Sequence, residues 1–465
     1  MKDNRKLFQV RLLERVNELF KNGRYQDVIT LIEGTQIKNI QAYNVAGICA
    51  VQLRLMKKAE FFFREVVSLN PDLAEAHNNL GNALKELKRF DEAKECYLKA
   101  LSLNSCAEKS YHNLGLILKE QRRYDEAEHY YRQALLIKPD YAEAELGMSE
   151  LLLTRGKFEE GWKLHEARYK RYGAASIKNT RAPIHLPFPQ WQGQALTGKS
   201  ILLWKEQGHG DEIQFCRYTS ELKKLGAKRI TLVCKEPLRK LFMSLDNVDL
   251  VTAEDEVDKI PAHDFWTLLL SLPLFCETRL NNIPADLPYL YASATQVEHW
   301  KTRIPATGFR IGLVWKGASG HKNDANRSIP SLKHLAPLWS IPGAVFISLQ
   351  KENGEEEALS PPAGQSLIVL GTDINDFSDT AAIITLLDLV ISVDTAIAHL
   401  AGALNKPCWV LLPAVGTDWR WLHDRKDSPW YPKIMRLFKQ EAVDDWESVV
   451  GKAAHELERM LQTYG

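Results

Sequence analysis

Apolar residues recur at helical spacing through the first third of the chain and gather into short continuous runs after it. Between residues 74 and 104, leucine, alanine and aromatic positions return every third or fourth residue, as in amphipathic helices. From residue 199 onward, apolar runs such as SILLW, RITLVC and FWTLLLSL alternate with helical stretches such as DEIQFCRYTSELKKLG and SLKHLAPLWS. Such alternation predicts parallel sheets covered by helices. The pattern therefore predicts an α-helical region followed by an α/β region.

The helical region repeats itself. Segments that begin at Ile40, Ala74, Glu108 and Ala142 align at a period of 34 residues, and GRYQDVITLIE fits a divergent earlier copy. Small residues recur where two helices must approach, and aromatic residues recur in the second helix of each copy. This pattern resembles the tetratricopeptide repeat, which implies a superhelix over residues 1–170.

Such arrays present an extended concave face to peptides and proteins. Asn78, Asn82 and Asn113 lie on first helices, where their amides are able to bond a bound polypeptide backbone. A purely solvated role for these asparagines is an equally good interpretation of the pattern.

The remaining chain divides into three parts. Residues 171–198 are rich in Pro and Gly and lack periodicity, which indicates a linker. Residues 199–305 and 306–465 each read as one α/β lobe, so two sheets are expected to face each other across a cleft. Ligands of such sheets bind at the carboxyl ends of the strands.

The stretch EQGHGDEIQF lies between the first strand and the first helix of the α/β region. It lacks the third glycine of a dinucleotide-binding loop, since Ile213 stands there. Gly208, His209 and Gly210 form a hinge that we assign to the acceptor side. Asp211 is interpreted either as the N-cap of the helix or as a carboxylate able to take a proton from an attacking hydroxyl.

The second lobe carries the segment VISVDTAIAHLAGALNKPCWVLL. A buried strand ends at Asp394 and Thr395, and a helix begins at once, which makes free amides available to an anion. His399 lies one helical turn after Thr395. A core histidine is the alternative interpretation of this residue.

A loop rich in Gly, Asn and Ser follows the first strand of the same lobe. Its cations are candidates for contact with phosphate: Lys316, Lys322 and Arg327. A solvated surface loop is the alternative.

An aromatic segment, GTDWRWLHDRKDSPWYPK, comes near the end of the chain. Trp419, Arg420 and Trp421 are candidates for contact with a sugar or a base. A loop anchored by its aromatic rings explains the same pattern equally well.

Composition narrows the function. Sixty basic against fifty-nine acidic residues give a net charge of +1, which argues against a nucleic-acid binder. Seven scattered cysteines predict neither a disulfide framework nor a zinc site. The amino-terminal stretch is charged and amphipathic, and no apolar run is long enough for a transmembrane segment. A cytoplasmic protein is expected.

Four motifs, in this order, carry a resemblance over nearly the whole chain: LLWKEQGHGDEIQFCRY, GLVWKGASGHKNDANRSIP, SVDTAIAHLAGALNKPCWVLLP and DWRWLHDRKDSPWYP. Together with the repeats they resemble bacterial repeat-linked glycosyltransferases. Their α/β half is similar to glycosyltransferase family 9, the ADP-heptose:lipopolysaccharide heptosyltransferases. The resemblance implies a GT-B fold of two Rossmann-like lobes facing a cleft.

The resemblance also implies roles for single residues. Asp211 stands where the family has its general base. Asp394, Thr395 and His399 stand in the segment that holds the donor diphosphate, and Ala396 replaces the glycine usual there. A phosphate-binding lysine of the family falls near Lys316 or Lys322.

A glycosyltransferase is therefore expected. It would use a nucleotide-activated sugar as co-substrate, need no cofactor or metal, and act on a polypeptide such as flagellin that the repeats recruit. A lipopolysaccharide or capsule sugar transferase whose repeats bind an assembly partner, and a non-catalytic scaffold with a decayed GT-B half, are the alternatives.

Overall fold

The computed structural model describes residues 2–35, 38–170, 186–254, 256 and 260–463. Contacts divide the chain into two compact units, 1–151 and 152–465, and each is described by itself. Of the predicted linker 171–198, residues 171–185 lie outside the described residues.

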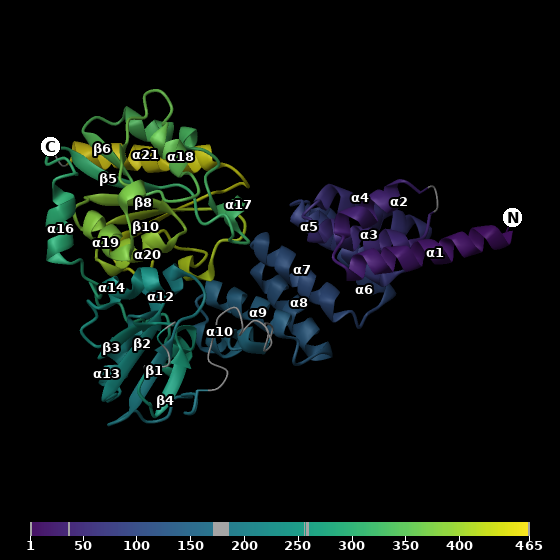
Figure 1. Cartoon of the computed structure of the whole chain (residues 1–465), viewed down its shortest axis with the longest axis horizontal. Coiled ribbons are helices and arrows are strands. Elements are labelled where there is room, and N and C mark those ends of the chain that lie inside the picture. The colour runs from purple at the N-terminus through teal and green to yellow at the C-terminus, as the bar shows by residue number, and fades with distance from the viewer. Residues whose placement is uncertain (1, 36–37, 171–185, 255, 257–259, 464–465) are drawn as a thin grey trace. The chain divides into compact units, whose positions relative to one another are not determined.

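The first unit is a series of helical hairpins (Figure 1). From residue 40 onward, the first helix of each hairpin begins 34 residues after the one before it, at 40, 74, 108 and 142. The helices are α1 (Lys2–Lys21), α2 (Tyr25–Glu33), α3 (Ile40–Gln52), α4 (Met56–Leu69), α5 (Ala74–Glu86), α6 (Phe90–Leu103), α7 (Glu108–Glu120), α8 (Tyr124–Ile137) and α9 (Ala142–Thr154), the last of which runs into the second unit.

A glycine lets the two helices of each hairpin approach closely. A Cβ on Gly81 would lie 2.6 Å from the ring of Tyr97, and one on Gly115 would lie 2.7 Å from the ring of Tyr131. Both rings are fully buried. In each hairpin a glycine of the first helix packs against an aromatic ring of the second. This contact recurs every 34 residues, as the sequence does.

The predicted partner-binding asparagines are bonded to one another across repeats. Asn113 Nδ2 donates to Asn78 Oδ1 at 3.1 Å and to Asn82 Oδ1 at 3.0 Å, and Asn82 Oδ1 also accepts from the Tyr97 hydroxyl at 2.8 Å. Asn78 and Asn113 are each only 8% exposed. These amides therefore hold neighbouring repeats together, and their predicted contact with a partner stays a prediction.

The second unit opens with α10 (Phe158–His165) and contains two parallel sheets (Figure 1). The first has the strand order β3-β2-β1-β4 and the second β10-β9-β8-β5-β6-β7. The strands are β1 (Ser200–Trp204), β2 (Arg229–Cys234), β3 (Leu250–Ala253), β4 (Phe265–Leu268), β5 (Phe309–Val314), β6 (Ala344–Ser348), β7 (Ile368–Val369), β8 (Leu389–Val393), β9 (Cys408–Leu412) and β10 (Met435–Lys439).

Helices follow these strands in both lobes. The α-helices are α12 (His209–Phe215), α13 (Tyr218–Lys224), α14 (Arg239–Phe242), α15 (Leu272–Phe275), α16 (Ala294–Lys301), α17 (Asp324–Arg327), α18 (Glu355–Leu359), α19 (Phe377–Thr385), α20 (Ala396–Ala403) and α21 (Trp446–Gln462). The 3-10 segments are η1 (Glu236–Leu238), η3 (Leu269–Ser271), η4 (Leu332–Ser340), η5 (Gly371–Asp373) and η6 (Trp419–Trp421).

The second sheet is buried on both faces, as its continuous apolar strands predict. Val390 and Val410 pack in the same core as α19 and α20, whereas their neighbours Ile391 and Leu411 pack in the core of η4 and α21. Alternate residues of each strand thus point to opposite helical layers.

Three predicted elements differ in the structure. The run FWTLLLSL is a strand only to Leu268, and SLKHLAPLWS is a 3-10 segment around Pro337. The single helix expected over 211–226 breaks between α12 and α13.

Side chains explain this break. The Tyr289 hydroxyl donates to the carbonyl of Ile213 at 3.0 Å, and Arg217 Nε donates to the carbonyl of Gln214 at 2.8 Å. Such insertions into the hydrogen-bond ladder bend helices.

The segment that follows α10 is anchored in the first lobe. Arg168 is 3% exposed, and its guanidinium donates to Glu206 Oε1 at 2.6 Å and to Ser271 Oγ at 2.7 Å. Glu206 follows β1 and Ser271 ends η3 after β4. Arg168 therefore fills the point between β1 and β4 where the strand order of this sheet reverses.

We predict that Gly81→Ala destabilises the repeat array. The added methyl would meet the Tyr97 ring at 2.6 Å, and overpacking of this kind costs about 1–3 kcal/mol. Chemical unfolding of the full chain, followed by far-UV circular dichroism, measures the change.

Gly451→Ala is the matched control, because Gly451 lies in α21 with open space around it. There the same substitution should stabilise the helix by about 0.5–1 kcal/mol. Equal effects at the two glycines would contradict the packing role of Gly81.

Candidate functional site between the two lobes

The candidate site lies where α12 of the first lobe meets α20 of the second. In open α/β sheets the ligand crevice is at the carboxyl ends of the strands, where the strand order reverses. In the second sheet this point is between β5 and β8, so the segments after Val314 and Val393 border it. Helices α12 and α20 pack against each other there (Figure 1).

Asp211 is the third residue of α12, and Gly208 is the N-cap. The interpretation of Asp211 as the N-cap is thus wrong in position, although its carboxylate does have a capping role. Asp211 Oδ2 accepts from the Gly208 N–H at 2.7 Å, and Oδ1 forms an ion pair with Arg420. Burial raises the pKa of Asp211, and the charge of Arg420 opposes this rise.

Arg420 connects the two lobes. Its Nε donates to Gln214 Oε1 at 2.5 Å, and its NH1 donates to the two carboxylate oxygens of Asp418 at 3.0 and 2.9 Å. Its guanidinium also lies 4.4 Å from the ring centre of Trp419. With 6% of its surface exposed, Arg420 is a buried cation that depends on the acids around it.

The hinge before Asp211 touches the second lobe. A Cβ on Gly210 would lie 3.0 Å from His399 Cδ2 and 3.4 Å from Ala396 Cα, so the glycine permits the close contact of α12 with α20. The ring of His209 lies 5.1 Å from that of Phe377. Burial and two nearby lysines lower the pKa of His209 to about 4, so its ring is neutral at neutral pH.

His399 is a buried histidine. Its Nδ1 lies 3.0 Å from the Tyr431 hydroxyl, and its ring stacks on Trp421 with the centres 5.3 Å apart. Burial lowers its pKa well below the usual value, and the charge of Arg420 acts in the same direction. The core interpretation of His399 fits these contacts, because a neutral ring offers no cation to a diphosphate.

Thr395 caps α20. Its Oγ1 accepts from the Ile397 N–H at 3.3 Å and lies 3.0 Å from the Ser392 hydroxyl. Burial and the charge of Asp418 raise the pKa of the Asp394 carboxyl. An anion would therefore be held by the amides of this helix start rather than by the Asp394 carboxylate, which repels it.

The three predicted cations lie in different surroundings. Arg327 NH1 donates to the Asp394 carbonyl at 3.0 Å, so the structure brings these two predicted residues together. Lys316 is paired with Glu357. Lys322 is exposed. Arg327 thus contacts the segment that leads into α20.

Trp419 and Trp421 belong to the interior. Trp421 is fully buried, and Trp419 is 6% exposed, with its ring 5.1 Å from that of Trp162 in α10. Neither ring offers a free face for a sugar or a base, so the anchoring interpretation of the aromatic segment fits the structure.

Two residues of the site were not among those predicted. Gln214 lies one turn after Asp211 in α12, and this spacing of three residues was the signal that could have identified it. Asp418 stands beside Arg420 in the sequence, but nothing in the sequence showed that both face Asp211.

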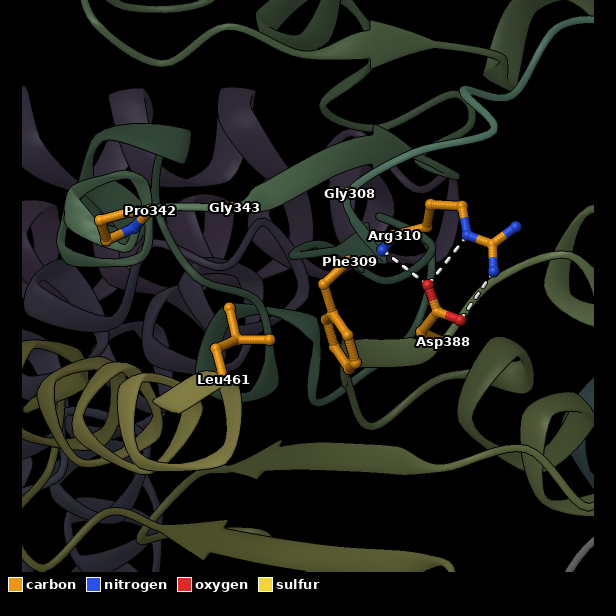
Figure 2. A pocket seen from close by; sticks show the side chains of 7 residues that line it. All are labelled: Gly308, Phe309, Arg310, Pro342, Gly343, Asp388 and Leu461. Carbon is orange, nitrogen blue, oxygen red and sulfur yellow. Dashed lines mark hydrogen bonds and ion pairs between the residues drawn. The ribbon is translucent and has the colours of Figure 1, made fainter. Parts of the chain in front are cut away.

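A separate depression of about 370 Å³ lies at the amino ends of β5 and β8 (Figure 2). Arg310 and Asp388 form a two-pronged ion pair in it, with distances of 2.9 and 2.7 Å. Because ligands of parallel sheets bind at the opposite edge, this depression is not the candidate site.

The described residues contain neither a metal-binding cluster nor a membrane-spanning helix. No cluster of three or more His, Cys, Asp or Glu side chains suits a metal ion there. Over the same part of the chain, no helix combines the length and the apolar character needed to cross a membrane.

Known proteins match the repeats and part of the second unit. Family models described as tetratricopeptide repeat match residues 40–73, 74–105 and 108–141, which confirms the predicted repeats there. Protein FlbA of Caulobacter vibrioides is 28% identical over 338 residues, which cover 68% of this chain and 55% of that protein. The chain thus spans about half the length of this curated relative.

Several solved structures are also similar over part of the chain. MamA is 20% identical and matches 36% of this chain and 96% of its own, with a TM-score of 0.31. PilF of Pseudomonas aeruginosa is 18% identical, with coverages of 37% and 79% and a TM-score of 0.32. The OM64 TPR domain of Arabidopsis is 27% identical, with coverages of 24% and 93% and a TM-score of 0.24.

We predict that Glu212→Gln flattens the dependence of stability on pH. Burial raises the pKa of the fully buried Glu212 from 4.5 to about 7. Folding thus favours the protonated form of Glu212. The stability that this group contributes to the folded protein is lost as the pH rises through about 7. One pKa unit corresponds to about 1.4 kcal/mol, so the loss between pH 4.5 and 7.5 is about 3 kcal/mol.

Thermal unfolding at pH 4.5 and 7.5 tests this. The natural protein should lose more stability than the variant on going to the higher pH, because glutamine keeps the neutral form. Parallel curves for the two proteins would contradict the assignment.

Proposed function

We propose that the chain is a glycosyltransferase with a GT-B arrangement of its two lobes, which transfers a sugar from a nucleotide-activated donor to a hydroxyl group. The observation that carries the proposal is the position of Asp211. A half-buried carboxylate of one lobe lies near the start of α20 in the other lobe and contacts a guanidinium. This arrangement suits a base next to a leaving group that carries negative charge.

In the proposed reaction Asp211 takes the proton of an acceptor hydroxyl. The hydroxyl oxygen forms a bond to the anomeric carbon, and the bond from that carbon to the phosphate oxygen breaks. The nucleotide leaves with the electron pair. Burial raises the pKa of Asp211, which makes its carboxylate a stronger base.

The leaving nucleotide needs positive stabilisation. We assign it to the positive end of the α20 dipole and to Arg327, whose guanidinium lies against Gly317 and reaches the Asp394 carbonyl. In this mechanism the protein's own donors, rather than a bound metal, offset the charge that develops on the phosphate.

The acceptor is proposed to be a polypeptide such as flagellin. The tetratricopeptide repeats of residues 40–141 are a type of array that binds proteins, and holding the acceptor on them raises its concentration at the site. We place the activity in the cytoplasm, where thiols stay reduced, since the seven cysteines are free.

A non-catalytic scaffold is the second candidate. It is favoured by the internal contacts of His399, Trp419, Trp421 and Lys316, which are bonded or packed within the protein. Calorimetric titration with ADP, CDP, CMP, GDP and UDP separates the two candidates. An enzyme should bind one of these nucleotides, and binding of none would overturn the proposed transfer.

We predict that Asp211→Asn abolishes sugar transfer and retains nucleotide binding. Asparagine keeps the shape of the side chain and its bond to the Gly208 N–H, but it cannot take up the proton. Transfer should fall at least about 100-fold, as expected for loss of a general base. Steady-state assays and calorimetry on the same preparation measure both quantities.

The control for this experiment is that the Asp211→Asn variant keeps the natural fold. Far-UV circular dichroism should stay close to that of the natural protein, because Asp418 still pairs with Arg420 in the variant. A folded variant that transfers sugar at the natural rate would rule out Asp211 as the base.

We predict that Asn82→Ala weakens the use of a protein acceptor but spares hydrolysis of the donor. Loss of one hydrogen bond to a bound backbone should raise the KM for flagellin by about two- to tenfold. Donor hydrolysis in the absence of acceptor is the internal reference.

Lys99→Ala, at an exposed position of α6, is the matched control in the repeats. If both variants raise the KM equally, or neither does, Asn82 does not contact the acceptor.

A further inference from the structure

The charges around Arg420 do not balance. Four carboxylates, those of Asp211, Asp324, Asp394 and Asp418, lie near two guanidinium groups, those of Arg327 and Arg420, and the charge of Lys235 also acts on Asp211. When all seven groups are ionised, this set carries one excess negative charge. Burial raises the pKa of Asp211 and of Asp394, and the charge of Asp418 acts in the same direction on both. A diphosphate would increase this deficit unless a cation were to change partners.

Arg420 is the cation placed to do so. One of its nitrogens, NH2, bonds Asp211 of the first lobe, while NH1 and the main-chain N–H bond Asp418 of the second. The two bonds to Asp418 oxygens, at 3.0 and 2.9 Å, anchor the guanidinium to its own lobe. The hydrogen bonds made by Nε and NH2 cross to α12, where they reach Gln214 and Asp211.

The pairing also weakens Asp211 as a base. One carboxylate oxygen accepts from Gly208 and the other from Arg420. The positive charge of Arg420 opposes the rise in the pKa of Asp211, so the carboxylate takes up a proton less readily while the pair persists. Asp211 is therefore a stronger base once Arg420 has left it.

We propose that Arg420 is a donor-dependent switch that pairs with Asp211 in the free protein and turns to the donor diphosphate once it binds. This inference rests on the proposed function. A diphosphate carries more negative charge than one carboxylate and accepts two parallel bonds from a guanidinium. The start of α20 is close by, since Gly210 of α12 touches Ala396 and His399. The exchange frees Asp211 Oδ1 for the acceptor, so the donor binds first.

The switch predicts competition between Asp211 and phosphate for one cation. Removal of the Asp211 charge should release Arg420 and tighten the binding of a nucleoside diphosphate. The probe is whichever of ADP, CDP, GDP and UDP binds the natural chain, with the matching nucleoside as a phosphate-free comparison. Asp211→Asn should lower the Kd of the diphosphate roughly fivefold or more, the lower range of coupling between sites. The Kd of the nucleoside should stay unchanged.

A double-mutant cycle assigns the effect to Arg420. Arg420→Gln should weaken diphosphate binding, and Asp211→Asn should give no gain when added to it. Arg420→Lys keeps the charge and serves where the glutamine variant does not fold. With lysine at position 420, Asp211→Asn should still tighten diphosphate binding, but by less than with arginine there.

Lys240→Gln is the matched control. It removes a different ion pair between the lobes, that of Lys240 with Asp376 at 2.7 Å, and should leave the Kd unchanged.

The outcomes separate the two proposals. If the natural chain binds a diphosphate and Asp211→Asn binds it no more tightly, the switch is overturned and the proposed transfer stands. If the nucleoside gains as much as the diphosphate, the switch is likewise overturned. If no nucleotide binds the natural chain, the proposed function fails and the switch fails with it.

Discussion

The second unit depends on the burial of a single guanidinium. Arg420 lies almost out of reach of water between two sheets, and an isolated charge there would be very costly. It is tolerated because acids and an amide from both lobes surround it. A buried ion pair contributes little net stability, but the loss of one partner leaves the other charge uncompensated. The lobes are therefore held in register by the need to keep this cation paired.

A second cation acts in the same way at the back of the site. Arg217 of the first lobe donates to the Trp430 carbonyl of the second at 2.7 Å and to the Tyr289 hydroxyl at 2.9 Å. Its guanidinium also lies 4.6 Å from the ring centre of Tyr431. Because Tyr289 in turn bonds the carbonyl of Ile213, the packing of the lobes and the break between α12 and α13 have a common origin.

Local patterns were readable from the sequence, and contacts between distant segments were not. The repeats were identified because Gly81 and Gly115 meet the same kind of neighbour at the same spacing. The strands were identified because buried parallel strands are continuously apolar. The break at Arg217 could not be predicted, since it is made by Tyr289, far along the chain. The burial of Trp419 and Trp421 likewise depends on distant segments, namely α10 and the helix of His399. The partner of Asp211, Arg420, also lies far along the chain.

The anchoring of Arg168 has a consequence for how the protein can be divided. The last hairpin helix, α10, belongs to the second unit: Trp162 donates to the Thr278 carbonyl at 3.1 Å, and Phe158 stacks on Trp430. A truncation that removed the whole repeat region through residue 170 would also remove Arg168. Glu206 and Ser271 would then stand open at the strand-order reversal of the first sheet. The longest amino-terminal deletion that spares the lobes ends before α10, and the repeat series is shared between the two units.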